Sequence, residues 1–149
     1  TSCEVAPDPM RRLFVLYFPD KVLAENIAVR MHMTKRQKET MVKWAASDIG
    51  LENILEEKLR RKVIYRYGKD FCINKLLIDA AKTQIVPDNL IGLISEIKET
   101  AVPVFPVSGR DILQKGIDGG QIGQFLDKLE ERWIAGDFSL SKEELLAGI

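Results

Sequence analysis

The chain has 149 residues, of which 46% are hydrophobic and 30% are charged, and its formal net charge is zero. This composition is typical of a folded globular protein with its own core and excludes a disordered tail. No apolar run reaches the ~18 residues of a membrane helix and the N-terminus lacks a signal-peptide pattern, so we expect a cytoplasmic protein without a membrane span.

Capping signals predict the first three helices. Asp8 followed by proline predicts a helix over residues 9–18, which Pro19 ends. Asp20 caps the next helix, and Thr34 with Gln37 forms a capping box that opens the third. The apolar positions at helical spacing in the second helix are Val22, Leu23, Ile27 and Met31.

The rest of the chain also predicts helices. A long helix over residues 51–67, ended by Gly68, carries Leu55, Leu59, Val63 and Tyr67 on one face. Further helices are expected around residues 71–80, around 90–97 and after the capping-box residue Ser141. The two prolines of VPVFPV argue against a strand, so residues 101–108 should be an extended linker. The fold class is therefore all-α, with a helical body-like domain over residues 1–100 and a smaller tail domain over 101–149.

The stretch 108–126 holds five of the chain's ten glycines. Ser108 or Asp111 caps a short helix, residues 111–115, that Gly116 terminates. A turn then opens a helix reaching about Ala135, which predicts a helix-turn-helix-like hairpin. Its predicted apolar stripe is Ile122, Leu126, Leu129 and Trp133.

The glycines of this turn have two interpretations. Gly119 or Gly120 holds a positive φ in a purely structural turn, and Gly123 allows another backbone to pack closely. Alternatively, the N–H groups of Gly120, Gln121 and Ile122 point at a phosphate from a helix N-terminus. Asp118 argues against the phosphate, because its carboxylate could occupy the same donors.

The zero net charge hides an asymmetry between the two halves. Residues 1–75 contain 15 Lys or Arg against 10 Asp or Glu, whereas residues 76–149 contain 7 against 12. Two basic runs, within residues 35–43 and 58–66, could bind phosphate backbones. Each run by itself also fits a solvated helix face.

Metal and thiol chemistry find little support in the sequence. Cys3 and Cys72 have no metal-ligand spacing, and reduced cysteines are expected in a chain without a secretory signal. His32 is the single histidine and cannot build a zinc site or a Cys–His dyad alone; we expect it near a helix end.

The segment Phe105–Leu146, FPVSGRDILQKGIDGGQIGQFLDKLEERWIAGDFSLSKEELL, closely resembles the tail of the CCA-adding tRNA nucleotidyltransferases. These enzymes form the bacterial and mitochondrial branch of the poly(A) polymerase family. The shared pattern is FP-x-SG-x-D, a glycine turn, I-G-x-x-L, a Trp-containing helix and E-E-L-L. RLFVLYFPD, MTKRQKE and LRRKVIYRYG resemble the body domain of the same enzymes more weakly. The turn GIDGGQIG departs from many relatives, whose turn is longer and contains proline.

The resemblance implies that different parts of the full enzyme have different roles. An N-terminal catalytic head adds C, C and A to tRNA using Mg²⁺ with CTP and ATP, while body and tail grip the acceptor and T arms. This chain resembles body and tail only, and its first methionine is Met10, which favours a piece of a longer chain. Two-metal transfer needs closely spaced carboxylates, and no Asp-x-Asp occurs in the sequence. We therefore expect no catalysis and no cofactor in this chain, with tRNA and the chain's own head as partners.

Duplex-like tRNA arms should be recognised through shape and phosphates. The leading contact candidates are Arg60, Arg61, Lys62 and Arg66, followed by Lys35, Arg36 and Lys38. The tail candidates are Arg110, Lys115 and the N–H groups of Gly119, Gly120 and Gln121. Two alternatives stay open: the same region of a poly(A) polymerase, and a helical protein-interaction or dimerisation module whose acidic C-terminal half meets a basic partner. The oligomeric state is open as well.

Overall fold

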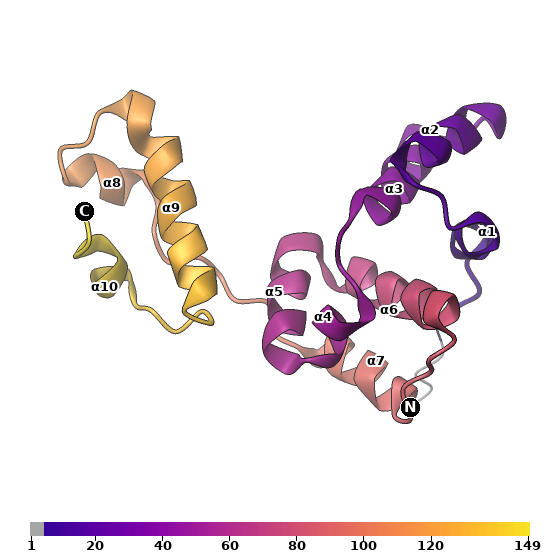
Figure 1. Cartoon of the computed structure of the whole chain (residues 1–149). Helices are drawn as coiled ribbons and strands as arrows, with labels where there is room; N and C mark the ends of the chain where they lie inside the picture. Colours follow the sequence, from indigo (N-terminus) through magenta and orange to yellow (C-terminus); the bar gives the residue numbers. More distant parts are fainter. Residues whose placement is uncertain (1–4) are drawn as a thin grey trace. The chain divides into compact units, whose positions relative to one another are not determined.

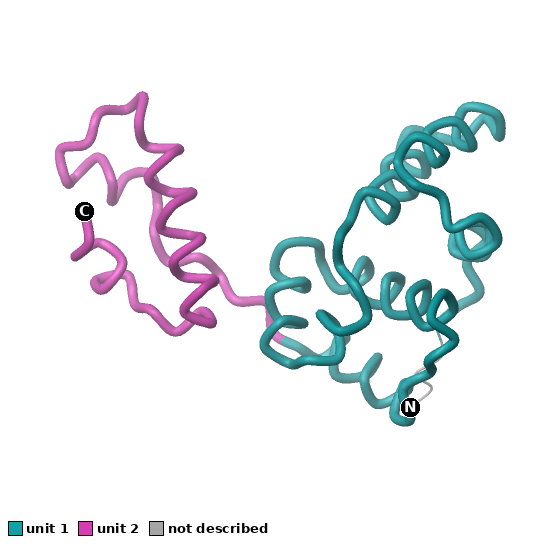
Figure 2. Tube along the Cα trace, in the orientation of Figure 1, with its two compact units in different colours: residues 1–100 teal, residues 101–149 magenta. Residues whose placement is uncertain are grey.

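A computed structural model describes residues 5–149, which form ten α-helices and one 3₁₀ turn and contain no strand (Figure 1). The predicted all-α fold class is confirmed. The chain divides into two compact units, Thr1–Thr100 and Ala101–Ile149 (Figure 2). The first unit contains α1 (Pro9–Tyr17), α2 (Lys21–Arg30), α3 (Lys35–Ala46), α4 (Leu51–Leu55), α5 (Glu57–Tyr67), α6 (Lys69–Thr83) and α7 (Leu90–Glu99). The second contains α8 (Gly109–Gln114), the 3₁₀ turn η1 (Gly119–Gln121), α9 (Ile122–Ala135) and α10 (Lys142–Leu146).

The predicted N-caps of the first unit are confirmed. The Asp8 carboxylate accepts from the Met10 N–H at 2.8 Å, and Asp20 accepts from the Leu23 N–H at 2.8 Å. The capping box of α3 is complete. His32 lies just after α2 with φ of 50°, near a helix end as expected. Local hydrogen bonds of this kind satisfy orphan backbone donors and depend on a few neighbouring residues.

The buried face of α2 differs from the prediction. Val22, Leu23 and Met31 are exposed, whereas Ala24 and Ala28 are almost fully buried. This helix packs against α3 through its alanines, whose small side chains let two helices approach closely. Only Ile27 of the predicted apolar face packs against the core.

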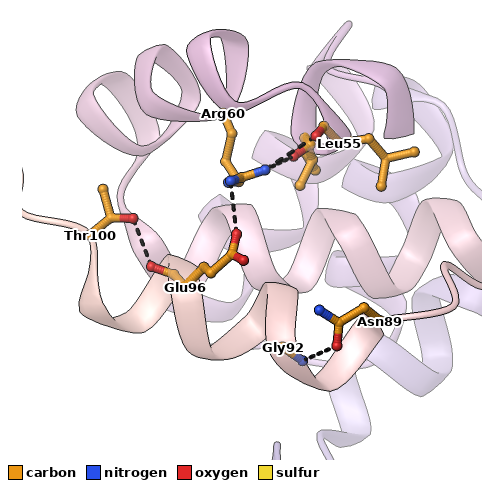
Figure 3. Close-up of polar contacts among 7 residues, drawn as sticks. Leu55, Arg60, Asn89, Gly92, Glu96 and Thr100 are labelled. Atoms are coloured by element: carbon orange, nitrogen blue, oxygen red, sulfur yellow. Dashed lines mark hydrogen bonds and ion pairs between the residues drawn. The ribbon is translucent and has the colours of Figure 1, made fainter.

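The predicted helix over residues 51–67 is two helices. The backbone is extended at Glu56, with φ of −79° and ψ of 124°, and separates α4 from α5. Arg60 stabilises this break: its guanidinium donates to the carbonyl oxygens of Ile54 at 3.0 Å and Leu55 at 3.2 Å (Figure 3). The α4 carbonyls left without helical partners at the break are thereby satisfied.

The core of the first unit includes Phe14, Met41, Trp44, Ile54, Ile64, Leu76 and Ile97. Phe14 and Trp44 pack edge to face with ring centroids 5.6 Å apart. Burial raises the pKa of the Cys72 thiol to about 12, so this free cysteine is an inert core residue. Cys3, the second cysteine, lies outside the described residues.

The second unit is a small helical cluster around Trp133. Residues 101–108 contain no helix. Trp133 is buried between Phe105 at 5.4 Å and Phe138 at 5.0 Å between ring centroids. The other buried apolar residues of this unit are Val107, Ile112, Leu129, Ile134 and Leu145. From the predicted stripe of α9, Ile122 and Leu126 are only half-buried.

The glycine turn departs from two expectations. Gly119 and Gly120 have no positive φ; they begin the 3₁₀ turn, and the left-handed residue is Gly116 with φ of 81°, where α8 ends. A Cβ added at Gly123 would meet nothing within 4 Å, so no other backbone packs against it. The chain reverses at the end of α8 and needs left-handed backbone there, whereas the later glycines follow ordinary helical backbone.

An ion pair ties α10 to α8. The Nζ of Lys142 lies 2.7 Å from Asp111 Oδ1, while Asp111 Oδ2 accepts from the N–H and hydroxyl of Ser108 at 2.8 and 2.7 Å. Ser108 is therefore the N-cap and Asp111 its partner within the first turn of α8. The hydrogen bond from Lys142 and those from Ser108 lower the pKa of Asp111 from 3.8 to about 2.

This depressed pKa predicts an acid-sensitive contribution to the stability of the second unit. The contribution is fully present above the ordinary pKa of 3.8 and is lost as the pH falls through about 2. We expect Asp111→Asn to melt at a lower temperature than the parent at neutral pH, with the gap closing between those two values. Thermal unfolding followed by circular dichroism at several pH values measures this gap. A gap that is constant down to the lower value would show that the carboxylate charge does not stabilise the unit.

Candidate nucleic-acid interface

The first basic run lies on α3 and is exposed. Lys35, Arg36 and Lys38 all face solvent, and Lys35 lies only 3.9 Å from Glu39 with its side chain 91% exposed. Such an exposed pair contributes little to stability and leaves the lysine accessible. Arg36 and Lys43 are seven residues apart and share one face of the helix, whereas Lys38 lies roughly 140° from Lys43 around the axis.

The second basic run lies on α5, and its first-named candidate for phosphate contact, Arg60, is buried in the structure. Arg60 is 7% exposed and donates to Glu96 Oε2 at 3.0 Å in addition to its bonds to two backbone carbonyls (Figure 3). Its charge and donors are used inside the protein, so we remove Arg60 from the candidate phosphate contacts. Arg60 sits on the buried side of α5 with Val63 and Ile64, and a basic run read along the sequence does not reveal which member turns inward.

The remaining members of this run keep access to solvent. Arg66 is exposed, Arg61 and Lys62 are half-buried, and both arginines also contact other groups of the protein. Lys62 and Arg66 are four residues apart and share one face. They lie on the side of α5 opposite its buried residues, where a phosphate backbone could reach them.

Lys43 joins α3 to the C-terminal end of α5. Its Nζ lies 5.3 Å from the ring centroid of Tyr67 and 5.2 Å from that of Phe71, and it donates to the Tyr67 carbonyl at 3.5 Å. Tyr67 stacks on Phe71 with ring centroids 4.6 Å apart, and it directly follows Arg66 in α5. The aromatic faces attract and hold the ammonium group, which keeps a positive charge at the meeting point of α3 and α5.

Lys43 is absent from the site candidates predicted from the sequence, although it belongs to the first basic run. Its neighbours Tyr67 and Phe71 are more than twenty residues away in the chain, and no short-range pattern indicates that contact. One sequence signal could have identified Lys43: it lies seven residues after Arg36, on the same face of the helix.

The tail candidates lie in the second unit. Arg110 and Lys115 are exposed near the two ends of α8. The Gln121 N–H donates to the Asp118 carbonyl at 2.9 Å, so it is not a donor available to a phosphate, while Gly119 and Gly120 are exposed. Residues 101–149 hold five Lys or Arg against eight Asp or Glu, so this unit is acidic. The electrostatic case for phosphate binding is therefore stronger in the first unit.

Residues 5–149 show neither a metal cluster nor a membrane helix. Within that part of the chain, no three His, Cys, Asp or Glu side chains gather where they could hold a metal ion. None of its helices has the length and apolar character needed to cross a membrane. The Mg²⁺, CTP and ATP that the family resemblance implies for a catalytic head stay a prediction.

Comparison with known proteins confirms the resemblance over part of the chain. The chain is 44% identical over 59 residues to "CCA tRNA nucleotidyltransferase 1, mitochondrial" of Mus musculus, a match that covers 39% of this chain and 14% of the mouse protein. The Homo sapiens protein of the same name is 41% identical over 58 residues, covering 38% of this chain and 13% of the human protein. The Danio rerio protein is 38% identical over 56 residues, or 37% of this chain and 13% of the relative. No protein-family model matches the chain.

These matches concern a short region of much longer proteins. The chain is similar to part of the CCA tRNA nucleotidyltransferases and spans only a small share of their length. The names of the relatives refer to mitochondria, so the cytoplasmic location expected from the sequence stays a prediction.

Proposed function

We propose that the chain is a tRNA-binding region of a CCA-adding nucleotidyltransferase. In this proposal it holds the backbone of the acceptor and T arms, while a catalytic head outside this chain adds the nucleotides. The similarity to three such enzymes supports the enzyme class, and the absence of an Asp-x-Asp pair from the sequence supports a non-catalytic role for this region.

The contact of Lys43 with the C-terminal end of α5 carries the proposal, because it holds a cation of α3 beside the helix that carries the second basic run. We name the α3–α5 basic surface by its residues, which are Arg36, Lys43, Lys62 and Arg66. Each Lys or Arg of such a surface can neutralise one phosphate of an RNA strand. A basic run that is only a solvated helix face would not need a contact between the two helices. The aromatic contacts of Lys43 also hold its charge in place.

Salt-dependent tRNA binding tests this surface. Replacing Arg36 and Lys43 together by alanine should weaken binding and reduce the slope of log K against log salt by ~0.7–0.9 for each phosphate that the variant no longer neutralises. Lys38→Ala is the matched control, because Lys38 is an exposed cation of the same helix on a different face. Fluorescence anisotropy with labelled tRNA at several salt concentrations measures both quantities.

The outcome separates RNA binding from a solvated face. A double variant whose slope equals that of the parent would remove Arg36 and Lys43 from the interface. A reduction of affinity in Lys38→Ala that is about half of that in the double variant, one charge against two, would indicate attraction by net charge without a defined surface. Circular dichroism of each variant checks that α3 remains folded.

A further inference from the structure

Asp118 precedes a glycine in the exposed turn between α8 and α9. The chain has ten aspartates, and Asp118 is the one that a glycine follows; none of the asparagines precedes a glycine. Asp118, Gly119 and Gly120 are all exposed, at the point where η1 begins. Exposed turns of small residues open locally more readily than the interior of a helix. This turn therefore combines a carboxyl group with an unshielded and accessible main chain.

The carboxyl group of Asp118 and the nitrogen of Gly119 have no polar partners. Within residues 5–149 the carboxylate forms neither a hydrogen bond nor an ion pair, and the Gly119 N–H has no acceptor. A Cβ added at Gly120 would lie 3.3 Å from Asp118 Oδ2, so the carboxyl group leans forward along the chain, toward the residues that follow it. Gly119 has no side chain to shield its nitrogen from that group.

We propose that Asp118 is a site of spontaneous isomerisation to isoaspartate. The Gly119 nitrogen attacks Asp118 Cγ, and the hydroxyl of the protonated carboxyl group leaves with the amide proton as one molecule of water. The product is a cyclic succinimide, to which water then adds. Cleavage of the new bond between nitrogen and Cγ restores aspartate, whereas cleavage of the original peptide bond leaves the main chain running through Cγ. The reaction needs no oxidant, reductant or enzyme, and its product has the mass of the parent with one more methylene in the main chain.

One backbone hydrogen bond restrains this reaction in the folded chain. The ψ angle of Asp118 is 140°, and it must rotate before the Gly119 nitrogen can reach Cγ. The rotation moves the Asp118 carbonyl oxygen, which accepts from the Gln121 N–H at 2.9 Å. Loss of one such bond corresponds to a factor of about ten at most, so the folded chain should isomerise no more than about tenfold more slowly than a synthetic peptide of residues 114–124. The modification does not depend on RNA binding.

Prolonged incubation of the 149-residue chain at physiological pH and temperature tests the proposal. A purified isoaspartyl methyltransferase with a labelled methyl donor measures the isoaspartate, and peptide mapping with electron-transfer fragmentation locates it. We expect isoaspartate at Asp118 and none at Asp127, which is exposed in α9 but precedes a lysine. Gly119→Ala should slow the accumulation severalfold, because its methyl group shields the nitrogen, whereas the matched control Gly123→Ala should isomerise as the parent does. A Cβ at either glycine meets nothing within 4 Å, so both variants should fold.

Three results would overturn the proposal. Equal accumulation at Asp118 and Asp127 would mean that the glycine turn confers no selectivity. An equal rate in Gly119→Ala and in the parent would exclude the unshielded nitrogen as the cause. Absence of isoaspartate from the folded chain, after a time in which the peptide of residues 114–124 has isomerised completely, would show that the turn holds the two reacting groups apart.

Discussion

Replacement of Trp133 by alanine is expected to unfold residues 101–149 while the first unit stays folded. Trp133 is 3% exposed, and its ring packs against both Phe105 and Phe138, so it is the centre of this unit's core. Truncating a buried tryptophan costs ~3–5 kcal/mol, and a unit well under ~70 residues has little more stability than that.

The chain's two tryptophans make this prediction easy to measure, since Trp44 lies in the first unit and Trp133 in the second. In Trp133→Ala, we expect the emission of Trp44 to report a folded first unit, while limited proteolysis cuts within α8 to α10. Trp133→Phe is the matched control, because it retains an aromatic ring and should remain folded. A Trp133→Ala variant that resists proteolysis as the parent does would show that the unit has a further source of stability.

Replacement of Arg60 by alanine is expected to destabilise the first unit by about 2–4 kcal/mol. The substitution leaves the buried Ile54 carbonyl and the Leu55 carbonyl without their donor and removes the partner of Glu96. Buried acceptors that lose their partner cost ~1–3 kcal/mol each, whereas a surface cation contributes little. Urea unfolding followed by Trp44 emission in a Trp133→Phe background measures the free energy of unfolding.

Two controls assign the effect to the buried carbonyls. Glu96→Gln should cost less than about 1 kcal/mol, because the Glu96 side chain is 58% exposed and an amide oxygen still accepts from Arg60. Lys58→Ala, at an exposed cation of the same helix, should change the free energy by no more than about 0.5 kcal/mol. If Arg60→Ala behaves like Lys58→Ala, the guanidinium does not stabilise the break between α4 and α5.

Local signals of the fold were predictable from the sequence. The caps at Asp8, Asp20 and Thr34 depend on hydrogen bonds within three residues, and all three are confirmed. The same holds for the capping box at Ser141 and for the end of α9 at Ala135. Each of these features is decided by neighbouring residues, which a sequence shows directly.

Features that depend on tertiary contacts were not predictable. The break at Glu56 interrupts a regular apolar pattern and is stabilised by Arg60, whose other partner, Glu96, lies on α7. α2 buries its alanines and exposes most of its larger apolar side chains because α3 packs closely against Ala24 and Ala28. Gly116 ends α8 with a positive φ, as its place after the helix predicts, whereas the positive φ expected at Gly119 or Gly120 is absent and α8 begins two residues earlier than predicted.

In the candidate site as well, local features are evident from the sequence and tertiary contacts are not. That two basic runs exist is evident from the sequence, and their exposed members Lys35, Arg36 and Lys38 lie on one predicted helix. The inward turn of Arg60 and the contact of Lys43 with Tyr67 join residues far apart in the chain. Sequence reasoning can therefore nominate a cluster of cations, while the packing of helices decides which of them faces a ligand.

Amide hydrogen exchange with and without tRNA tests the central claim most directly, because it locates the contact on the chain. The proposal predicts slower exchange in peptides from α3 and from the C-terminal half of α5 when tRNA is added, at salt low enough for binding. Peptides from α7, which carries none of the proposed contacts, serve as the internal reference. Protection confined to α7, or no protection in α3 and α5 at a tRNA concentration that saturates binding, would contradict the proposed α3–α5 basic surface.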